Sequence, residues 1–392
     1  MMKRLIVCLL LMSSASWSVA AELSQYAANK AMKANQLAQN DKLSEAIRTL
    51  KDAEVSRAYD KAYLARMLGV FYWQNEQLQP ALKSLQQAVS SGELADDQAW
   101  TTRKMLADLL LVDHQYAKAL PHYYQLVKAV PKDQNEYELW LRIGQIHYQS
   151  EQWQKSLDAI AQYEKFRRPD EVTPLSVKLG AQLQLERWKP AIPTIKRLLA
   201  LEPEKSNWWL QLVSLELRTG QKRDALSSLG LAKLQGIDLS QQDLRLLAQL
   251  YAQNGVPERA AQVLEMLDDA DSDIQLITER AFYWQRAKEW DQAISTWTLA
   301  TRFNQKYHWN VAQLLNQQGQ YREALVELDK VKEKDRQSQV ALARTRALYK
   351  LNQLEDALIQ AKKANNIDPS KEAEGWIKYL SQLRKIQDQR TS

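Results

Sequence analysis

Small and large apolar residues alternate along this chain with a long and regular period. Ten small residues, called anchors below, recur every 31 to 38 positions, and in nine cases a larger apolar residue follows four positions later. A second small residue usually lies twelve positions before the anchor, as at Gly69 and Ala107. Two antiparallel helices approach closely where a small side chain on one faces a bulky side chain on the other. The pattern therefore predicts ten helix pairs with these anchors: Ala46, Ala81, Ala119, Ser156, Ala191, Ala225, Ala260, Ala293, Ala324 and Ala357.

Residues that tolerate a left-handed backbone mark the turn inside several predicted pairs. Gly220, Gly255 and Gly319 each lie five positions before an anchor, and Asp41 and Asn352 occupy the same slot. Such residues end one helix and turn the chain into the next. Each pair is therefore expected to be a helix, a tight turn and a second helix.

These features resemble the tetratricopeptide repeat, which has small residues at its eighth and twentieth positions, aromatic residues between them and a closing proline. The segment 65–89 (ARMLGVFYWQNEQLQPALKSLQQAV) matches that pattern almost throughout. The resemblance implies an all-α fold, a right-handed superhelical solenoid of about ten helix-turn-helix repeats followed by a C-terminal capping helix. Two local departures stand out. Gly180 precedes Ala191 by only eleven residues, which predicts a turn one residue short, and Thr345 and Arg346 replace small and neutral residues in the tenth repeat.

The first twenty residues have the pattern of a secretory signal peptide. Lys3 and Arg4 precede the apolar run 5–12, and small residues follow up to Ala20 and Ala21, where cleavage is expected. The apolar run is far shorter than the roughly 20 residues of a membrane span. We therefore predict a signal peptide over 1–20, a single repeat array over 22–369 and a capping helix with a tail over 370–392, with no membrane span after cleavage.

Composition narrows the class of partner. The single cysteine, Cys8, lies in the predicted signal peptide, so the mature chain has no disulfide and no thiolate metal site. Removing Lys3 and Arg4 lowers the net charge from +6 to +4, which is too diffuse to indicate a nucleic-acid partner. An exported helical chain without cysteine is predicted to reside in the periplasm.

The remaining side chains do not form a recognisable catalytic motif. No two of His114, His122, His147 and His308 have the spacing of a helical metal pair, and there is no glycine-rich phosphate loop or nucleophile elbow. We therefore expect no catalytic residue, no metal site and no cofactor. A basic run over 330–336 alternates with acidic residues and is expected to pair with them on a solvated face.

The repeat register indicates which residues line the inner surface of the array. These are the second, fifth, ninth, twelfth and thirteenth positions of each repeat, counted so that the anchor is position 20. Amides bond peptide groups, arginine binds carboxylates and aromatic rings make anchor contacts, so these positions suit a polypeptide partner. The alternative for any one of them is a solvated surface with incidental rings. Lys306 and Lys350 belong to the same projection, and the predicted binding residues are Tyr63, Arg66, Trp73, Tyr148, Arg245, Gln249, Phe282, Arg286, Trp309, Gln313 and Arg346.

The segment 22–50 (ELSQYAANKAMKANQLAQNDKLSEAIRTL) and the repeat after it look similar to periplasmic tetratricopeptide proteins associated with TonB energy-transducing systems of marine gammaproteobacteria. The resemblance implies an accessory protein that helps TonB and its ExbB/ExbD-type motor act on outer-membrane receptors, often for iron complexes. Two other functions fit the same repeats. They are an envelope-assembly or chaperone-like adaptor, and a non-catalytic subunit of a cell-wall or polysaccharide machine.

Overall fold

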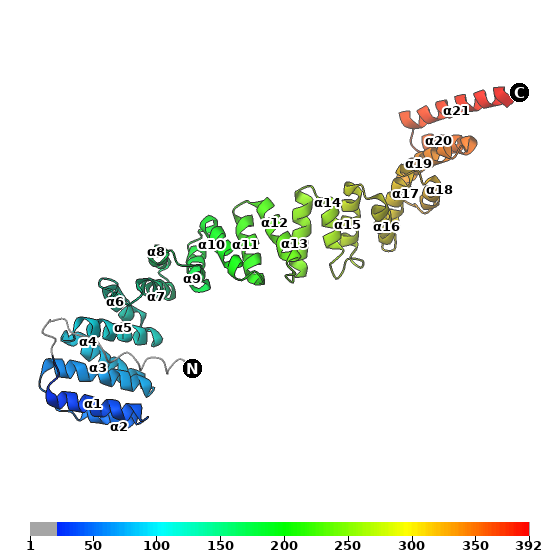
Figure 1. The fold of residues 1–392 in the computed structure, drawn as a ribbon. Coiled ribbons are helices and arrows are strands. Elements are labelled where there is room, and N and C mark those ends of the chain that lie inside the picture. Colours follow the sequence, from blue (N-terminus) through cyan, green and yellow to red (C-terminus); the bar gives the residue numbers. More distant parts are fainter. Residues whose placement is uncertain (1–21, 392) are drawn as a thin grey trace. The chain divides into compact units, whose positions relative to one another are not determined.

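The computed structural model describes residues 22–391, with side chains described for 22–386, so the predicted signal peptide with Cys8 lies outside it. Within the described residues every regular element is a helix, and the chain divides into two compact units after Pro203. Unit 1 contains α1 (Gln25–Gln39), α2 (Leu43–Lys51), α3 (Ala58–Gln74), α4 (Leu78–Ser91), α5 (Asp96–Val112), α6 (Tyr116–Leu126), α7 (Glu136–Gln149), α8 (Trp153–Glu164), α9 (Val172–Gln184) and α10 (Trp188–Leu201) (Figure 1).

Unit 2 begins at Glu204 and is described by itself. Two 3-10 turns, η2 (Gln305–Tyr307) and η3 (Lys334–Arg336), precede α17 and α19. Its α-helices are α11 (Ser206–Arg218), α12 (Lys222–Leu234), α13 (Gln241–Gln253), α14 (Pro257–Leu264), α15 (Ile274–Ala287), α16 (Trp290–Thr301), α17 (His308–Gln317), α18 (Tyr321–Asp329), α19 (Gln337–Lys350), α20 (Leu354–Ile367) and α21 (Lys371–Thr391).

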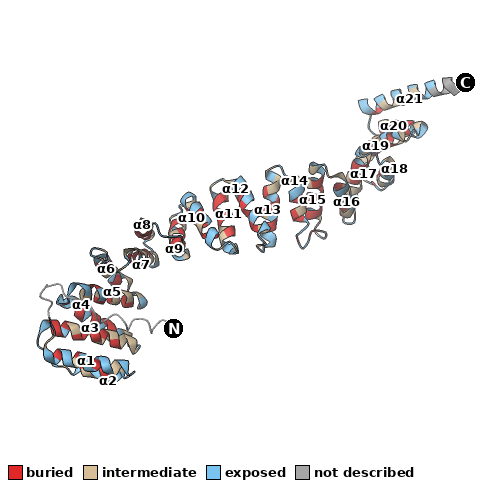
Figure 2. Ribbon diagram, viewed as in Figure 1, coloured by how far each residue is buried: buried red, intermediate tan, exposed pale blue. Residues whose placement is uncertain are grey.

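Helices pack as the anchor pattern predicts. In each unit every odd-numbered helix from α1 to α19 packs against the helix that follows it, and the second helix of one pair packs against the first helix of the next. Every second helix begins three residues before its anchor, and all ten anchors are completely buried. Buried positions recur in each pair (Figure 2). The prediction of an all-α array of ten helix-turn-helix repeats is confirmed.

In two pairs, the contact between the helices leaves no room for a side chain at the small residue of the first helix. A Cβ atom added to Gly69 would lie 2.5 Å from Cγ of Leu85, and one added to Gly144 would lie 2.9 Å from Cδ1 of Ile160. Both are much shorter than an ordinary van der Waals contact. Opposite Gly144, the hydroxyl of the anchor Ser156 donates a hydrogen bond to the Gly144 carbonyl (2.8 Å). The small residues therefore allow the helix backbones to approach.

Every turn inside a pair has the same left-handed residue. The residue five positions before the anchor has a φ between 53° and 78° in all ten repeats, including Glu76, His114, Glu151, Glu186 and Lys288. The next residue donates its N–H to the carbonyl five residues earlier, at 2.7–3.0 Å, as from Gln77 to Tyr72. This is a Schellman motif, which satisfies carbonyls at the helix end.

The fifth repeat corrects one prediction. Its turn consists of Leu185, Glu186 and Arg187, as long as the turns of most other repeats, so the expected short turn is wrong. Leu179 occupies the position normally held by a small residue. Gly180 serves another contact, because a Cβ atom there would lie 2.5 Å from the Tyr148 hydroxyl oxygen.

The tenth repeat packs as fully as the others. Thr345 is completely buried, and its hydroxyl donates to the Ala341 carbonyl at 2.9 Å. Beyond this repeat, α21 packs on α20 through the buried side chains of Ala373 and Leu380. The expected capping helix is therefore present.

Substituting Gly69 with alanine should destabilise the protein by about 1–3 kcal/mol, because the new methyl group overlaps Leu85 and the helices must separate. Gly375 is the control. It lies in α21 with open space around it, so Gly375→Ala should be neutral or stabilising by up to about 1 kcal/mol through helix propensity. Urea denaturation monitored by circular dichroism checks both. Equal effects of the two substitutions would contradict the close contact.

Glu186→Gly should stabilise the protein by about 0.5–1 kcal/mol, because the left-handed conformation is strained for a side chain but open to glycine. The reciprocal change, Gly220→Ala, places a Cβ atom at φ 77° and should lower stability. Thermal and urea melts measure both variants. A loss of stability in Glu186→Gly would show that the strain is not relieved in this way.

Candidate polypeptide-binding surface

The predicted binding residues all lie on first helices of the repeats, and none is buried. We call repeat positions 2, 5, 9, 12 and 13, counted with the anchor at position 20, the first-helix face. Unit 1 carries three of the predicted residues on α3 and one on α7, and unit 2 carries the others on α13, α15, α17 and α19. The structure does not test their role in binding. It does show which neighbours each one contacts.

In unit 1, Arg66 and Tyr63 lie together on α3. The Tyr63 ring is 6.2 Å from that of Tyr59, and burial lowers the pKa of Arg66. Trp73 is half-buried and packs against the central core of the unit. All three remain accessible from the first-helix face.

Tyr148 has a packing role as well. Its ring lies edge-on to Trp153 with centroids 5.0 Å apart, and its hydroxyl end approaches Gly180 in the next repeat. Because Gly180 belongs to α9, this side chain joins two successive first helices. Tyr148 therefore offers less free surface than its position in the repeat suggested.

Cations lie over aromatic rings on the first-helix face of unit 2. The Arg286 guanidinium is 5.8 Å from the centroid of Phe282, which is 50% exposed. Trp309 has a similar partner in Arg336, at 5.6 Å. An exposed ring with a cation over its face combines two groups that are common at protein interfaces.

Arg336 was missed in the sequence. The basic run was expected to pair with its own acidic residues, which is correct for Lys330, whose ammonium contacts Glu327 at 2.6 Å. Arg336 instead contacts Trp309 from the preceding repeat. The residue lies in η3, just before α19, and the repeat register alone did not mark it as part of the surface.

Other predicted residues join neighbouring first helices. Arg245 on α13 lies 3.8 Å from Asp273 at the start of α15, and Arg346 on α19 forms an ion pair with Glu372 on α21. Gln249 and Gln313 are exposed. Arg245 thus links α13 to the start of α15. The charge of Arg346 is balanced by Glu372.

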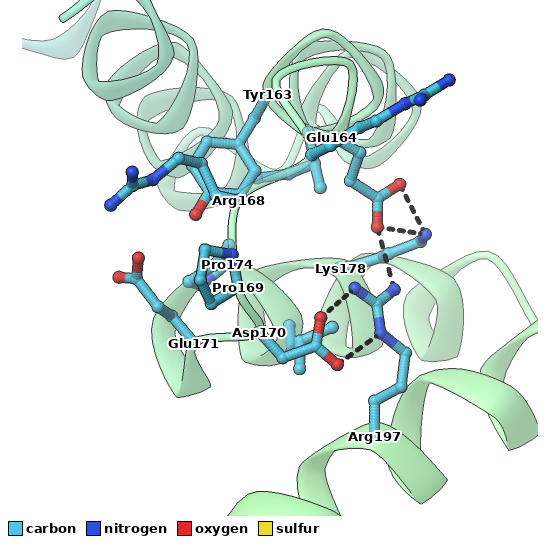
Figure 3. A pocket seen from close by; sticks show the side chains of 12 residues that line it. Tyr163, Glu164, Arg168, Pro169, Asp170, Glu171, Pro174, Lys178 and Arg197 are labelled. Carbon is cyan, nitrogen blue, oxygen red and sulfur yellow. Dashed lines mark hydrogen bonds and ion pairs between the residues drawn. The ribbon is translucent and has the colours of Figure 1, made fainter.

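A second polar cluster lies at the corner between α8, α9 and α10 in unit 1 (Figure 3). Lys178 donates to both Glu164 carboxylate oxygens at 2.8 Å, and Arg197 contacts Glu164 at 3.1 Å. Arg197 also binds Asp170 with two donors, at 2.9 and 2.5 Å. These hydrogen bonds lower the pKa of Asp170 and raise that of Arg197.

A cleft of about 360 Å³ adjoins this cluster, and Arg167, Arg168 and Glu171 line it as well. Glu164, Asp170, Lys178 and Arg197 satisfy one another. We therefore conclude that the cluster stabilises the contact between the fourth and fifth repeats.

His147 is buried, and its ring contacts side chains of the helix packing. Its ring nitrogens lie 2.8 Å from the Tyr124 hydroxyl and 3.1 Å from the Gln152 side-chain oxygen, and burial lowers its pKa.

Among residues 22–391, no group of three or more His, Cys, Asp or Glu side chains is arranged to hold a metal ion. In the same part of the chain, no helix has the length and apolar character needed to cross a membrane.

The fold and surface define a helical repeat scaffold, and sequence comparison identifies its class. The sequence model of the tetratricopeptide repeat matches residues 104–171, and the same anchors and turns extend through all ten helix pairs. Residues 104–171 therefore belong to the tetratricopeptide repeat family, and the other pairs have the same anchors and turns. Such arrays are in general non-catalytic scaffolds for protein interactions, which present extended surfaces to their partners.

Several solved structures are similar to this chain. They include a tetratricopeptide repeat protein from Parabacteroides merdae ATCC 43184, at 17% identity, covering 67% of this chain and 100% of that one with a TM-score of 0.38. The C-terminal part of a repeat-containing protein from Cytophaga hutchinsonii has 16% identity, coverage of 70% and 95%, and a TM-score of 0.37. MamA from Desulfovibrio magneticus RS-1 has 16% identity, coverage of 44% and 94%, and a TM-score of 0.35. No curated protein matches the chain.

Arg197→Gln should lower stability at pH 7 by about 1 kcal/mol or less, because the lost ion pairs are partly exposed. Asp170 has a lowered pKa in the folded state, so its stabilising contribution is present above the unfolded pKa of about 3.9 and is lost as pH falls through the lowered value. The difference between wild type and variant should therefore shrink toward pH 2–3. Urea melts across this range measure it, with Lys189→Gln on the same helix as the control. A constant difference at every pH would exclude the Asp170 contribution.

Proposed function

We propose that this protein is a periplasmic adaptor that holds protein partners on the first-helix faces of its two units. We further propose that it is an accessory component of a TonB-type energy-transduction system for outer-membrane transport. The location follows from the signal-peptide pattern over 1–20, and the TonB assignment from the resemblance of residues 22–50 and the following repeat.

The adaptor role rests on one observation, two pairs of an aromatic ring on a first helix of unit 2 with a cation over it. Phe282 with Arg286 and Trp309 with Arg336 place apolar area and positive charge on one surface. Burying an aromatic ring supplies much of the binding energy at protein interfaces, and arginine adds directional bonds to carboxylates. Exposed amides such as Gln249 and Gln313 can bond the peptide groups of a partner.

Removing the side chains of Arg286, Trp309 and Arg346 together by alanine substitution should reduce partner capture about tenfold while leaving helicity unchanged. Capture is measured by crosslinking in intact periplasm, followed by quantitation of TonB, ExbB and ExbD-type proteins and outer-membrane receptors. A matched variant removes Arg259, Arg322 and Lys362, which are exposed on the second helices α14, α18 and α20. Equal capture by both triple variants would place the binding surface elsewhere.

The TonB assignment has a separate test in the native host. A deletion strain should grow poorly when iron is supplied only as complexes taken up by TonB-dependent receptors. Normal uptake by every such route would overturn the TonB assignment and leave the adaptor role standing. Capture of outer-membrane assembly factors or cell-wall synthases in place of TonB components would favour the corresponding alternative.

A further inference from the structure

Acidic residues are absent from the first-helix face of unit 2. At positions 2, 5, 9, 12 and 13 of the four repeats that contain α13, α15, α17 and α19, no residue is Asp or Glu, although the whole chain has 47 of them against 53 Lys and Arg. None of these residues is buried. The cations are Arg245, Arg286, Lys306, Arg346 and Lys350, and the amides are Gln242, Gln249, Gln253, Gln275, Gln285, Gln313, Asn316, Gln317 and Gln339.

The acidic residues beside this surface are already engaged. Asp243 closes a capping box with Ser240, and Glu279 accepts a hydrogen bond from the Tyr283 hydroxyl at 2.8 Å. Asp273 caps α15 by accepting from the Gln275 N–H at 2.8 Å, and Glu372 pairs with Arg346 as described above. Many other carboxylates of the unit are on second helices, among them Glu258, Asp291, Glu323 and Glu355.

Three cations of the surface have no carboxylate partner among the described residues. Each lies over an aromatic ring, Arg286 over Phe282 at 5.8 Å, Lys306 over Tyr307 at 4.9 Å and Lys350 over Tyr349 at 5.9 Å. A ring beneath a cation limits the conformations of its side chain without neutralising its charge. These three positive groups are therefore held in place, and they leave the surface with uncompensated charge.

Unit 1 shows that this arrangement is not a general property of the chain. Three of its cations, Lys104, Lys178 and Arg197, are paired with carboxylates. Two others lie over rings, Lys30 over Tyr26 at 5.5 Å and Arg168 over Tyr137 at 4.8 Å. Its first-helix face includes Asp108 and Glu138, and it also has apolar residues at Val70, Leu111, Leu141 and Leu183. On this face of the described repeats, acidic residues occur only where the first helix is α5 or α7. The four repeats of α13, α15, α17 and α19 combine their absence with five cations.

We infer that the first-helix face of unit 2 docks an acidic, extended segment of a partner polypeptide. Carboxylates of the segment meet Arg286, Lys306 and Lys350, and the amide side chains bond its peptide groups. An extended chain rises about 3.3 Å per residue, so carboxylates at every third residue recur about every 10 Å along the segment. The inference rests on the proposed adaptor function and names the chemistry of its partner.

The test uses the mature chain, residues 22–392, and a fluorescent peptide of about twelve residues with glutamate at every third position among serine and alanine. Fluorescence anisotropy should show at least about tenfold tighter binding of this peptide than of its glutamine counterpart. The lysine counterpart should not bind. Affinity for the glutamate peptide should fall several-fold between about 50 and 300 mM salt, because exposed charges are screened.

Two triple variants locate the site. Arg286→Gln, Lys306→Gln and Lys350→Gln together should weaken binding of the glutamate peptide about tenfold or more. Arg259→Gln, Arg322→Gln and Lys362→Gln remove the same charge from second helices and should leave it nearly unchanged. Equal affinity for the glutamate and glutamine peptides, or equal loss in both variants, would overturn the inference.

The outcome separates this inference from the adaptor function. If envelope partners are still captured through Arg286, Trp309 and Arg346 while the acidic peptide does not bind, the partner chemistry is wrong and the adaptor function stands. If neither binds, both proposals fail.

Discussion

The close approach of two helix backbones inside each repeat is the constraint on which the rest of this structure depends. Where Gly69 meets Leu85, or Gly144 meets Ile160, the bulky side chain lies so close that a Cβ atom on the glycine would overlap it. The anchors are the small residues of the second helices, and all ten are fully buried. Within each unit, the second helix of one pair packs against the first helix of the next pair, so the first helices recur in the same order along the chain.

Much of the fold could be predicted from the sequence because its signals are local. Side-chain size at three positions per repeat identified the ten helix pairs. The left-handed turns were recognised only where the residue was Gly, Asn or Asp. At Glu151, Glu186 and Lys288 the same conformation is imposed by the hydrogen bonds of the helix end, which overcome the preference of the side chain. Gly180 was taken for the small residue of its helix pair, which gave the wrong prediction of a short turn. It makes room for Tyr148 of the preceding repeat.

The sequence predicted which residues lie on the candidate surface, but it did not predict which of their charges are free of ion pairs. Register placed Arg286, Trp309 and Arg346 on first helices, as found. Which charges are free depends on contacts between repeats, such as Arg346 with Glu372, 26 residues apart, and Arg336 with Trp309. These contacts follow from how successive helices stack, and residue type alone does not reveal them. In unit 2, Arg286, Lys306 and Lys350 lie over aromatic rings and have no carboxylate partner among the described residues. In unit 1, Lys104, Lys178 and Arg197 form ion pairs.

The close contact is tested most directly by a double-mutant cycle on Gly69 and Leu85, measured as free energies of unfolding. Leu85→Ala alone should cost about 2–5 kcal/mol, since it empties a fully buried position. In a Gly69→Ala background the same truncation should cost at least about 1 kcal/mol less, because the smaller side chain makes room for the new methyl group. Strict additivity of the two substitutions would show that the residues do not share one contact, and it would contradict the packing on which this account of the repeats is built.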